Sequence, residues 1–437
     1  MIEKLIYNYF ALPLGIGGFW LYSLFNSKAK KGWKARANIL SKFETELSRW
    51  EKEKRILLHI SSVGEYLQAR AVLRELKRIS PKLVRILTFF SPSLEPMLER
   101  GVEAELANYL PFDTPQNMKR LLKIITPNLI IFSCYDLWPN LIWQAKKRGI
   151  KVVLINATLA ENSFKRNFLV RWWFARLYNQ LDLILCASDE DKERIISLGV
   201  DSEKVSFAGN TRFSETLARI NAIAPNDELL AQLKIWKGER YCLVVGSSWE
   251  PDEQVLIPAY KKIYEKNRLK LILAPHEPHP KRIEKLKDIF RTANISSLTL
   301  SELEQSQNKL PKSWVIIVDS VGKLYKLYKV GDIAFVGGSF RKEVHNVMEP
   351  AGFGIPVLLG PKIKNSQEAL KLVERGGAKI VHNSDQLCQE LDLLLNNNEL
   401  RKNMGEKAYR LVEENQQALE RTIKHLQKNF PELFTND

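Results

Sequence analysis

Residues 56–65 read ILLHISSVGE, an apolar run of strand length that ends in a small, polar turn. A stretch with helical character follows it, roughly from Tyr66 to Ile79. Gly64 permits a tight turn between the two, because glycine has no side chain that restricts its backbone. A strand, a turn and a helix in this order form the first part of a βαβ unit, which is typical of parallel sheets.

Short apolar runs of the same kind recur in both halves of the chain. They lie at residues 56–60, 83–89, 129–134, 152–155, 183–187 and 205–208, and then at 241–246, 269–274, 314–318, 333–336, 356–359 and 379–381. Apolar runs separated by helical stretches indicate parallel α/β sheets, and their repetition predicts two doubly wound domains. The polar, helix-forming stretch 211–240 separates the two sets, so we place the domain junction there.

The predicted organisation is an α/β chain with two Rossmann-like domains that face a cleft. The boundaries that we expect are 1–36 for an N-terminal segment, 37–210 for the first domain, 211–240 for a linker, 241–395 for the second domain and 396–437 for a helical tail. Ligands of open α/β sheets bind beyond the carboxyl ends of the strands. Motifs that directly follow the apolar runs are therefore the candidate functional residues.

The N-terminal segment differs from the rest of the chain. No charged residue lies between Leu5 and Phe25, and about 20 apolar residues are enough to span a bilayer. The basic cluster that follows is Lys28, Lys30, Lys31, Lys34 and Arg36, and such clusters stay on the cytoplasmic side. We expect an uncleaved membrane-anchor helix, with the remaining chain in the cytoplasm. The alternative is a buried or interfacial helix, broken near Pro13 and residues 15–18.

The whole chain carries a formal net charge of +16. An excess of this size favours a polyanionic partner, such as nucleic acid, anionic lipid headgroups or a phosphorylated substrate. No nucleic-acid recognition motif is visible, so we expect no nucleic-acid partner. A second basic stretch, residues 165–176, interleaves Lys and Arg with Trp and Phe. This pattern suits an anionic membrane surface, and it also suits a helix whose aromatic residues lie in a core.

The cysteines exclude two further classes of protein. Cys134, Cys186, Cys242 and Cys388 are far apart and form no Cys-x-x-Cys pair. That spacing excludes a zinc finger and a disulfide scaffold, and it predicts reduced core residues of a cytoplasmic protein.

Glu65 stands at or just before the N-terminus of the helix that follows the first strand. The dipole and the free N–H groups at that end favour the carboxylate form. An ionised carboxylate suits a general base, which must accept a proton. On the residues alone, a capping role for Glu65 is the stronger interpretation.

Two motifs follow an apolar run near residue 336. Gly337-Gly338-Ser339 precedes the basic pair Arg341-Lys342, and glycines let backbone N–H groups approach a phosphate closely. Residues 345–349, HNVME, then open a predicted helix. Glu349 is placed either to accept hydrogen bonds from a ribose diol or to cap that helix.

Residues 245–248, VGSS, and 274–276, APH, end two other predicted strands. Their small and polar side chains suit the lining of a nucleotide pocket. None of these motifs contains an Asp-x-Asp pair or a His/Cys cluster with ligand spacing, so we expect no metal and no cofactor.

Five blocks of the chain resemble, in the same order, the Kdo transferases of the lipopolysaccharide pathway. The blocks are His59-x-x-Ser62-x-Gly64-Glu65, Tyr109-Leu110-Pro111-Phe112-Asp113, Leu137-Trp138-Pro139-Asn140, Phe335-Val336-Gly337-Gly338-Ser339 and His345-Asn346-x-x-Glu349. The resemblance runs from the N-terminal segment to the C-terminal helix. It implies the two-domain GT-B glycosyltransferase fold with an N-terminal anchor helix.

The resemblance also implies a reaction, the inverting and metal-independent transfer of Kdo, an acidic sugar, from CMP-Kdo to a hydroxyl of a lipid A precursor. The donor would bind mainly to the C-terminal domain and the lipid to the N-terminal domain, at the cytoplasmic face of the bacterial inner membrane. Glu65 is implied as the catalytic base, and Arg212 as a cation that faces the donor phosphate. The implied donor-binding residues are Arg212, Ser247, Ser248, Pro275, His276, Gly322, Gly338, Ser339, Asn346 and Glu349, and the implied acceptor-side residues are His59, Ser62, Gly64 and Asp136.

The chain departs from the family pattern at three places. Cys134-Tyr135-Asp136 stands where many members carry Glu-x-Glu, Pro275-His276-Glu277 where Pro-Arg-His is frequent, and Gly322-Lys323 where Gly-Glu is common. These changes predict altered donor or acceptor contacts in an active enzyme. Two alternatives remain open, another GT-B glycosyltransferase with a different nucleotide sugar and a non-catalytic, membrane-anchored nucleotide-binding module. Intact Glu65 argues against the second.

Overall fold

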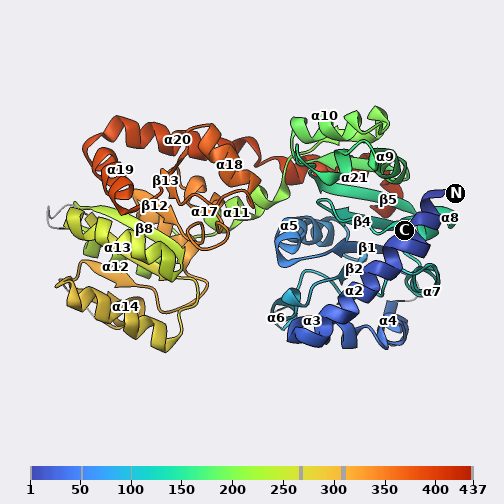
Figure 1. Cartoon of the computed structure of the whole chain (residues 1–437), viewed down its shortest axis with the longest axis horizontal. Coiled ribbons are helices and arrows are strands. Elements are labelled where there is room, and N and C mark those ends of the chain that lie inside the picture. The colour runs from blue at the N-terminus through green and yellow to red at the C-terminus, as the bar shows by residue number, and fades with distance from the viewer. Residues whose placement is uncertain (1, 51–52, 100, 265–268, 307–311, 435–437) are drawn as a thin grey trace. The chain divides into compact units, whose positions relative to one another are not determined.

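The computed structural model describes residues 2–50, 53–99, 101–264, 269–306 and 312–434. It divides into two compact units, the first formed by Met1–Glu215 with Asn415–Asp437 and the second by Thr216–Glu414. Each unit contains one seven-stranded sheet, and the strand pairs are parallel (Figure 1). The two parallel α/β sheets that the sequence predicted are thus confirmed.

The first sheet has the strand order β3-β2-β1-β4-β5-β6-β7. Its strands are β1 (Arg55–Ile60), β2 (Val84–Phe89), β3 (Leu106–Tyr109), β4 (Leu129–Ser133), β5 (Lys151–Ala157), β6 (Leu183–Cys186) and β7 (Val205–Phe207). Every residue of β1, β2 and β4 is buried, as expected of parallel strands with helices on both faces. That double burial explains why these strands read as nearly uninterrupted apolar runs.

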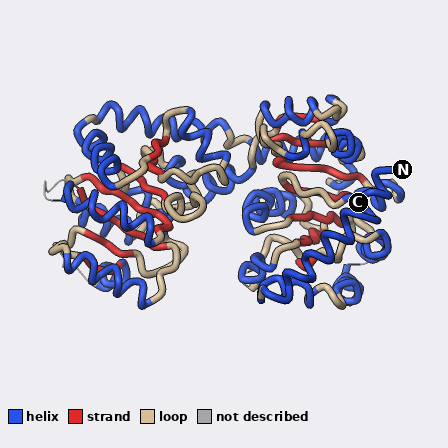
Figure 2. The backbone as a smooth tube through the Cα atoms, viewed as in Figure 1, coloured by secondary structure: helices blue, strands red, loops and turns tan. Residues whose placement is uncertain are grey.

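Helices lie on both faces of the first sheet (Figure 2). They are α4 (Ile39–Leu47), α5 (Val63–Ile79), α6 (Glu95–Leu98), α7 (Pro115–Ile125), α8 (Pro139–Lys147), α9 (Arg171–Tyr178), α10 (Asp189–Ser197) and α21 (Ala418–Asn429), with short helices η2 (Ser48–Trp50), η3 (Pro92–Leu94), η4 (Phe164–Arg166), η5 (Ser202–Lys204) and η7 (Pro431–Leu433). α5 begins at Val63, before the predicted Tyr66, because the Ser62 side chain caps it. α21 packs against α5, so the end of the chain belongs to the first unit.

The second sheet has the strand order β10-β11-β9-β8-β12-β13-β14. Its strands are β8 (Tyr241–Ser248), β9 (Leu269–Pro275), β10 (Ser297–Thr299), β11 (Val315–Ile317), β12 (Ile333–Val336), β13 (Val357–Leu359) and β14 (Ala378–Ile380). Its helices are α12 (Glu228–Lys237), α13 (Glu250–Tyr264), α14 (Pro280–Thr292), α15 (Leu300–Gln305), α16 (Leu324–Leu327), η6 (Tyr328–Val330), α17 (Met348–Gly352), α18 (Gln367–Glu374), α19 (Ser384–Asn396) and α20 (Asn398–Glu414). α11 (Thr211–Asn221) carries the chain from the first unit into the second.

The N-terminal segment is helical and lies across the first unit (Figure 1). It comprises α1 (Ile2–Ile6), the π-helix η1 (Tyr7–Ala11), α2 (Leu12–Phe25) and α3 (Ser27–Ala35). Polar groups fix one side of it, because Tyr7 Oη donates to Asp113 Oδ2 at 2.9 Å and Asn140 Nδ2 donates to Asn8 Oδ1 at 2.7 Å. No helix in the described part of the chain is both long and apolar enough to cross a membrane. The predicted membrane-spanning anchor is therefore not confirmed.

Arg36 differs from the other members of the basic cluster. Its guanidinium donates to the backbone carbonyls of Gly32, Phe90 and Leu110 and lies over the rings of Phe90 and Tyr109. Only 6% of Arg36 is exposed. The sequence placed Arg36 in a basic cluster on the cytoplasmic side of a membrane anchor. Its long side chain is used inside the protein, where it joins the N-terminal segment to the loops that follow β2 and β3.

Candidate functional site

The crevice of the first sheet lies where the strand order reverses, between β1 and β4. Ligands of doubly wound sheets bind at such a point, outside the carboxyl ends of the strands. Ser61 and Glu65 follow β1, and Asp136 follows β4. The Ser61 hydroxyl donates a hydrogen bond to Asp136, and the Ser61 backbone N–H donates one to Glu65 Oε2 at 2.6 Å. Ser61 thus joins two carboxylates that the sequence predicted separately.

Glu65 lies in the first turn of α5 and is 4% exposed. Its own backbone N–H donates to Ser62 Oγ at 3.4 Å, while its side chain turns back to accept the N–H of Ser61. This arrangement satisfies free donors at the start of the helix. The sequence offered a general base and a helix cap as alternatives for Glu65. Ser62 is the cap, and the side chain of Glu65 instead accepts the N–H of Ser61 in the turn before the helix.

Burial raises the pKa of Glu65 to about 7. The hydrogen bond from the Ser61 N–H opposes this rise, and the nearby charge of Asp136 adds to it. The sequence predicted the opposite direction, because a helix N-terminus favours an ionised carboxylate. Removal of water outweighs that effect at a buried site. A carboxyl group that titrates near neutral pH is well suited to accept a proton from a substrate.

The other predicted acceptor-side residues support this loop in different ways. His59 is 1% exposed, its Nδ1 lies 3.0 Å from Thr88 Oγ1, and burial lowers its pKa to about 3. The ring of His59 is thus neutral and buried within β1, before the turn formed by Ser61 and Ser62. Gly64 is exposed within the helix, where an added Cβ would meet only Ser62 Oγ at 3.7 Å. The tight turn predicted for Gly64 is made by Ser61 and Ser62 instead.

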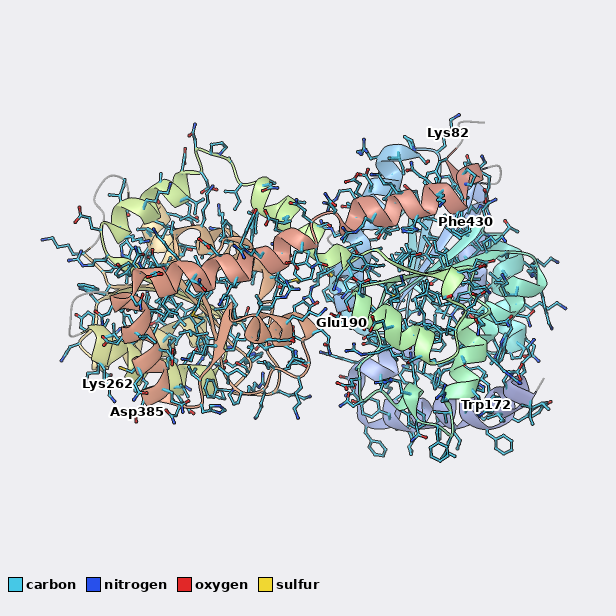
Figure 3. The ribbon with its side chains drawn as sticks, turned by 90° about the horizontal axis from the view of Figure 1, so that it is seen from above. Lys82, Trp172, Glu190, Lys262, Asp385 and Phe430 are labelled. Carbon is cyan, nitrogen blue, oxygen red and sulfur yellow. The ribbon has the colours of Figure 1, made fainter. Side chains whose placement is uncertain are left out.

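An apolar pocket of about 540 Å³ opens beside Asp136. This aromatic pocket is lined by Tyr7 and Ala11, by residues 135–139, and by Phe164, Lys165, Trp172, Trp173 and Phe174. Figure 3 labels Trp172 on α9, next to the N-terminal helices of the same unit. Phe164 and Trp172 are 68% and 37% exposed, so the pocket continues into an apolar outer surface.

Lys165 is the cation of the aromatic pocket. Its Nζ donates to the carbonyl of Tyr135 at 2.6 Å, and burial lowers its pKa to about 8, with the charge of Asp136 acting in the opposite direction. The sequence assigned Lys165 to a membrane-facing stretch. The structure places Lys165 in the same pocket lining as Asp136.

Asp113 connects two of the sequence blocks, the one that ends at Asp113 and the one that ends at Asn140. It is fully buried and accepts the backbone N–H groups of Asn140 and Leu141, each at 2.9 Å, at the start of α8. It also accepts the hydroxyl of Tyr7, and burial raises its pKa to about 7. Asp113 therefore ties α8 to the N-terminal segment.

The second sheet reverses its strand order between β8 and β12. Asp252, in the first turn of α13, links the ends of these strands. Its carboxylate accepts the backbone N–H groups of Trp249 and Gly338, each at 2.8 Å, and of Phe340 at 3.2 Å. Asp252 is not among the residues predicted from the sequence, where its one signal is an acid in a first helical turn directly after a strand.

Two polar groups of the Gly337-Gly338-Ser339 motif, which the sequence assigned to a phosphate, have partners within the protein. The Gly338 N–H is used by Asp252, and the Ser339 hydroxyl is fully buried and accepts the N–H of Gly360 at 2.7 Å. A Cβ at Gly337 would lie 2.6 Å from the carbonyl oxygen of Ser247. The small residues are needed for close packing of the two strand ends.

Several other predicted donor-side residues have partners within the protein. Ser248 Oγ donates to Glu253 Oε1 at 2.8 Å, Asn346 Oδ1 accepts the N–H of Met348 at 3.1 Å, and Arg219 donates to Glu349 at 3.1 Å. Lys323 pairs with Glu304. These bonds restrict which side chains are available to a ligand.

The remaining predicted residues lie at strand ends or turns. Pro275 ends β9, Ser247 and Gly322 have φ angles of 55° and 87°, and Arg212 lies in the part of α11 that belongs to the first unit. The ring of His276 stacks on the rings of Trp249 and His345, with centroid distances of 4.7 Å and 4.3 Å.

Comparison with known proteins identifies the family. A family profile described as 3-Deoxy-D-manno-octulosonic-acid transferase (kdotransferase) matches residues 31–215. The 3-deoxy-D-manno-octulosonic acid transferase of Haemophilus influenzae is 30% identical over 379 residues, which cover 84% of this chain and 85% of that protein. The chain belongs to the Kdo transferase family. A further Kdo transferase, from Chlamydophila psittaci, is 28% identical, with 85% of this chain and 84% of that protein covered.

Solved structures place this Kdo transferase in a wider fold group. A UDP-GlcNAc 2-epimerase from Neisseria meningitidis is similar with a TM-score of 0.61 and 15% identity, covering 86% of this chain and 100% of that one. A glycosyltransferase from Rickettsia africae gives a TM-score of 0.52 at 13% identity, with coverage of 88% and 100%. At these identities the likeness concerns the fold alone, and two parallel seven-stranded sheets are consistent with the GT-B glycosyltransferase fold.

A metal site needs several ligand side chains close together. Within the residues that the structure describes, no three His, Cys, Asp or Glu side chains are grouped so that they could hold a metal ion.

Proposed function

We propose that this Kdo transferase moves Kdo from CMP-Kdo to a hydroxyl of a lipid A precursor, with inversion at the anomeric carbon. The family profile and the relatives named as Kdo transferases support the identity of the sugar. The observation that carries the catalytic part is Glu65, a buried carboxyl at the reversal point of the first sheet whose pKa burial raises to about 7.

The reaction that suits this site is a single in-line displacement. Glu65 accepts the proton of the acceptor hydroxyl while the hydroxyl oxygen attacks the anomeric carbon of Kdo. The bond between that carbon and the CMP phosphate oxygen breaks on the opposite face, and CMP leaves with the electron pair. One displacement inverts the anomeric configuration. Protonated Glu65 then returns its proton to water.

The two oxygens of Glu65 are held unequally, which supports different roles for them. Oε2 accepts the Ser61 N–H at 2.6 Å, whereas Oε1 has only a 3.4 Å contact with Ser62 Oγ. We therefore assign proton transfer to Oε1. Asp136, fixed by the Ser61 hydroxyl, raises the basicity of Glu65 through its charge.

We place the acceptor lipid in the aromatic pocket and the protein on the cytoplasmic face of the bacterial inner membrane. Tyr9, Phe10, Leu14 and Phe25 on the N-terminal segment are between 66% and 84% exposed. An apolar helix face next to basic residues suits a helix that lies in the membrane interface. The pocket is lined both by residues of the N-terminal segment and by Asp136, so a lipid bound there would bring its sugar towards Glu65.

The direct test is to incubate the protein with CMP-Kdo and a lipid A precursor and to weigh the lipid product. Gain of the mass of one or more Kdo residues supports the proposal. Parallel reactions with UDP-sugars separate it from a different donor specificity. No transfer from any donor would leave the non-catalytic module as the better account.

A further inference from the structure

Three aromatic side chains form a ring stack at the second sheet, made of Trp249, His276 and His345. The planes of His276 and His345 are tilted by 15° and those of Trp249 and His276 by 29°. Trp249 Nε1 donates a hydrogen bond to His345 Nε2 at 3.0 Å. The three rings come from separate segments, since Trp249 follows β8, His276 follows β9 and His345 follows β12.

Burial disfavours the charged form of both imidazoles of the ring stack. Burial lowers the pKa of His345 to about 4, and the neighbouring His276 and Arg341 add to this shift. Burial also lowers the pKa of His276. The bond from Trp249 requires an unprotonated Nε2 on His345, which agrees with a neutral ring.

Arg341 is the cation that contacts the ring stack. Its guanidinium carbon lies 3.8 Å from the centroid of the Trp249 ring. The backbone of Arg341 is fixed, because its N–H donates to Gly338 O at 3.0 Å and its carbonyl accepts Lys362 Nζ at 2.8 Å. Stacking uses the face of a guanidinium and leaves the N–H groups at its edge free for a carboxylate or a phosphate.

The position of Arg341 is that of a ligand-binding group. Trp249 and Arg341 follow β8 and β12, the two strands between which the sheet order reverses. The Arg341 guanidinium contacts the face of the Trp249 ring. Gly338 and Ser339, which the sequence assigned to an anion, are already used inside the protein.

We propose that Arg341, held on the face of Trp249, is the anion-binding residue of the donor site. This inference rests on the proposed function, because CMP-Kdo carries two anionic groups, a tetrahedral phosphate and a planar carboxylate, and each can accept two N–H groups of a guanidinium. The ring stack keeps the guanidinium in place and supplies no competing charge. The experiment below decides which of the two groups, the phosphate or the carboxylate, Arg341 binds.

The test compares Arg341→Ala, Arg341→Lys and the matched control Lys342→Ala in the full chain. CMP affinity is measured by calorimetry, and the KM for CMP-Kdo is measured in the transfer assay. Loss of charge-assisted hydrogen bonds in Arg341→Ala weakens CMP binding by about 10- to 100-fold if Arg341 holds the phosphate. If Arg341 holds the carboxylate, CMP affinity is kept and the donor KM rises by a comparable factor. Arg341→Lys keeps the charge without the fork and restores only part of the loss.

Two results would overturn the proposal. One is an Arg341→Ala variant whose CMP affinity and donor KM both stay within about twofold of wild type. The other is an equal loss in Lys342→Ala, which would show a general effect of positive charge. If the wild-type protein used another nucleotide sugar instead of CMP-Kdo, the proposed donor would be wrong, and the same three variants measured with that sugar would still decide the role of Arg341.

A second set of variants tests whether Trp249 acts through Arg341. Trp249→Phe keeps a ring under the guanidinium and retains most of the affinity, whereas Trp249→Leu loses it. The double variant Trp249→Leu with Arg341→Ala is no worse than Arg341→Ala alone, because the two residues form one unit. Additive losses would contradict a positioning role for Trp249.

Discussion

The two sheets reverse their strand order in the same manner but carry different chemistry at the reversal. Between β1 and β4, Ser61 joins the carboxylates of Glu65 and Asp136. Between β8 and β12, the guanidinium of Arg341 lies on the ring of Trp249. A shared topology provides the crevice, and the residues that follow the strands decide its chemistry.

Burial shifts pKa values at both crevices. It raises the pKa of an acid and lowers the pKa of a base. It raises the pKa of Glu65 to about 7 and lowers that of His345 to about 4. In each case the neutral form is favoured, because an apolar environment disfavours charge. The result is a proton acceptor that works near neutral pH in one unit and an uncharged ring platform in the other.

The largest expected effect follows from Glu65→Gln. The amide cannot accept a proton, so kcat for Kdo transfer should fall by roughly 10²–10⁴-fold. CMP affinity, which we assign to the second unit, should stay unchanged. The exposed Glu99→Gln in the same unit is the matched control and should keep full activity. A Glu65→Gln enzyme with near wild-type kcat would remove the distinction between the two crevices.

Asp252→Asn, at the second crevice, should change mainly the KM for the donor, whereas Glu65→Gln changes kcat. One amide oxygen cannot replace a carboxylate that accepts three N–H groups, so the loop after β12 should lose its fixed position. We expect the KM for the donor to rise by about tenfold with a smaller change in kcat. A fall in kcat with an unchanged donor KM would contradict this division of roles.

The smallest expected effects concern stability, at Gly338 after β12 and at Gly64 after β1. Gly338 has a φ of 93° and a Cβ there would lie 2.2 Å from the Glu343 carbonyl oxygen, so Gly338→Ala should lower the free energy of unfolding by at least about 1–2 kcal/mol. Gly64 lies in a helix with room for a methyl group, so Gly64→Ala should be neutral or stabilise by roughly 0.5–1 kcal/mol. Chemical denaturation measures both, and similar losses in the two variants would disagree with the structure.

Features set by neighbouring residues were predictable from the sequence. The buried strands of both sheets follow from apolar runs, because helices on both faces demand apolar side chains along the whole strand. The position of Glu65 after β1 follows from the strand and the turn that precede it. The resemblance to the family added Asp136 to the same site.

Features set by distant residues were not predictable. The pKa of Glu65 depends on burial and on Asp136, which is far away in the sequence. Asp252 meets Gly338 only because β8 and β12 are adjacent in the sheet. The N-terminal segment has the composition of an anchor, and its place on the first unit depends on the bond between Tyr7 and Asp113.

The central claim is that buried Glu65, beside Asp136, is the base of Kdo transfer. The most direct test is kcat/KM as a function of pH, from about pH 5 to about pH 9, for the wild type and Asp136→Asn. Glu65 must be ionised to accept the proton, so the rate should fall tenfold per pH unit below a midpoint near the Glu65 pKa of about 7. Removal of the Asp136 charge should move this midpoint to lower pH. A midpoint near 4.5, the ordinary pKa of a glutamate, or a midpoint that Asp136→Asn leaves in place, would contradict the account.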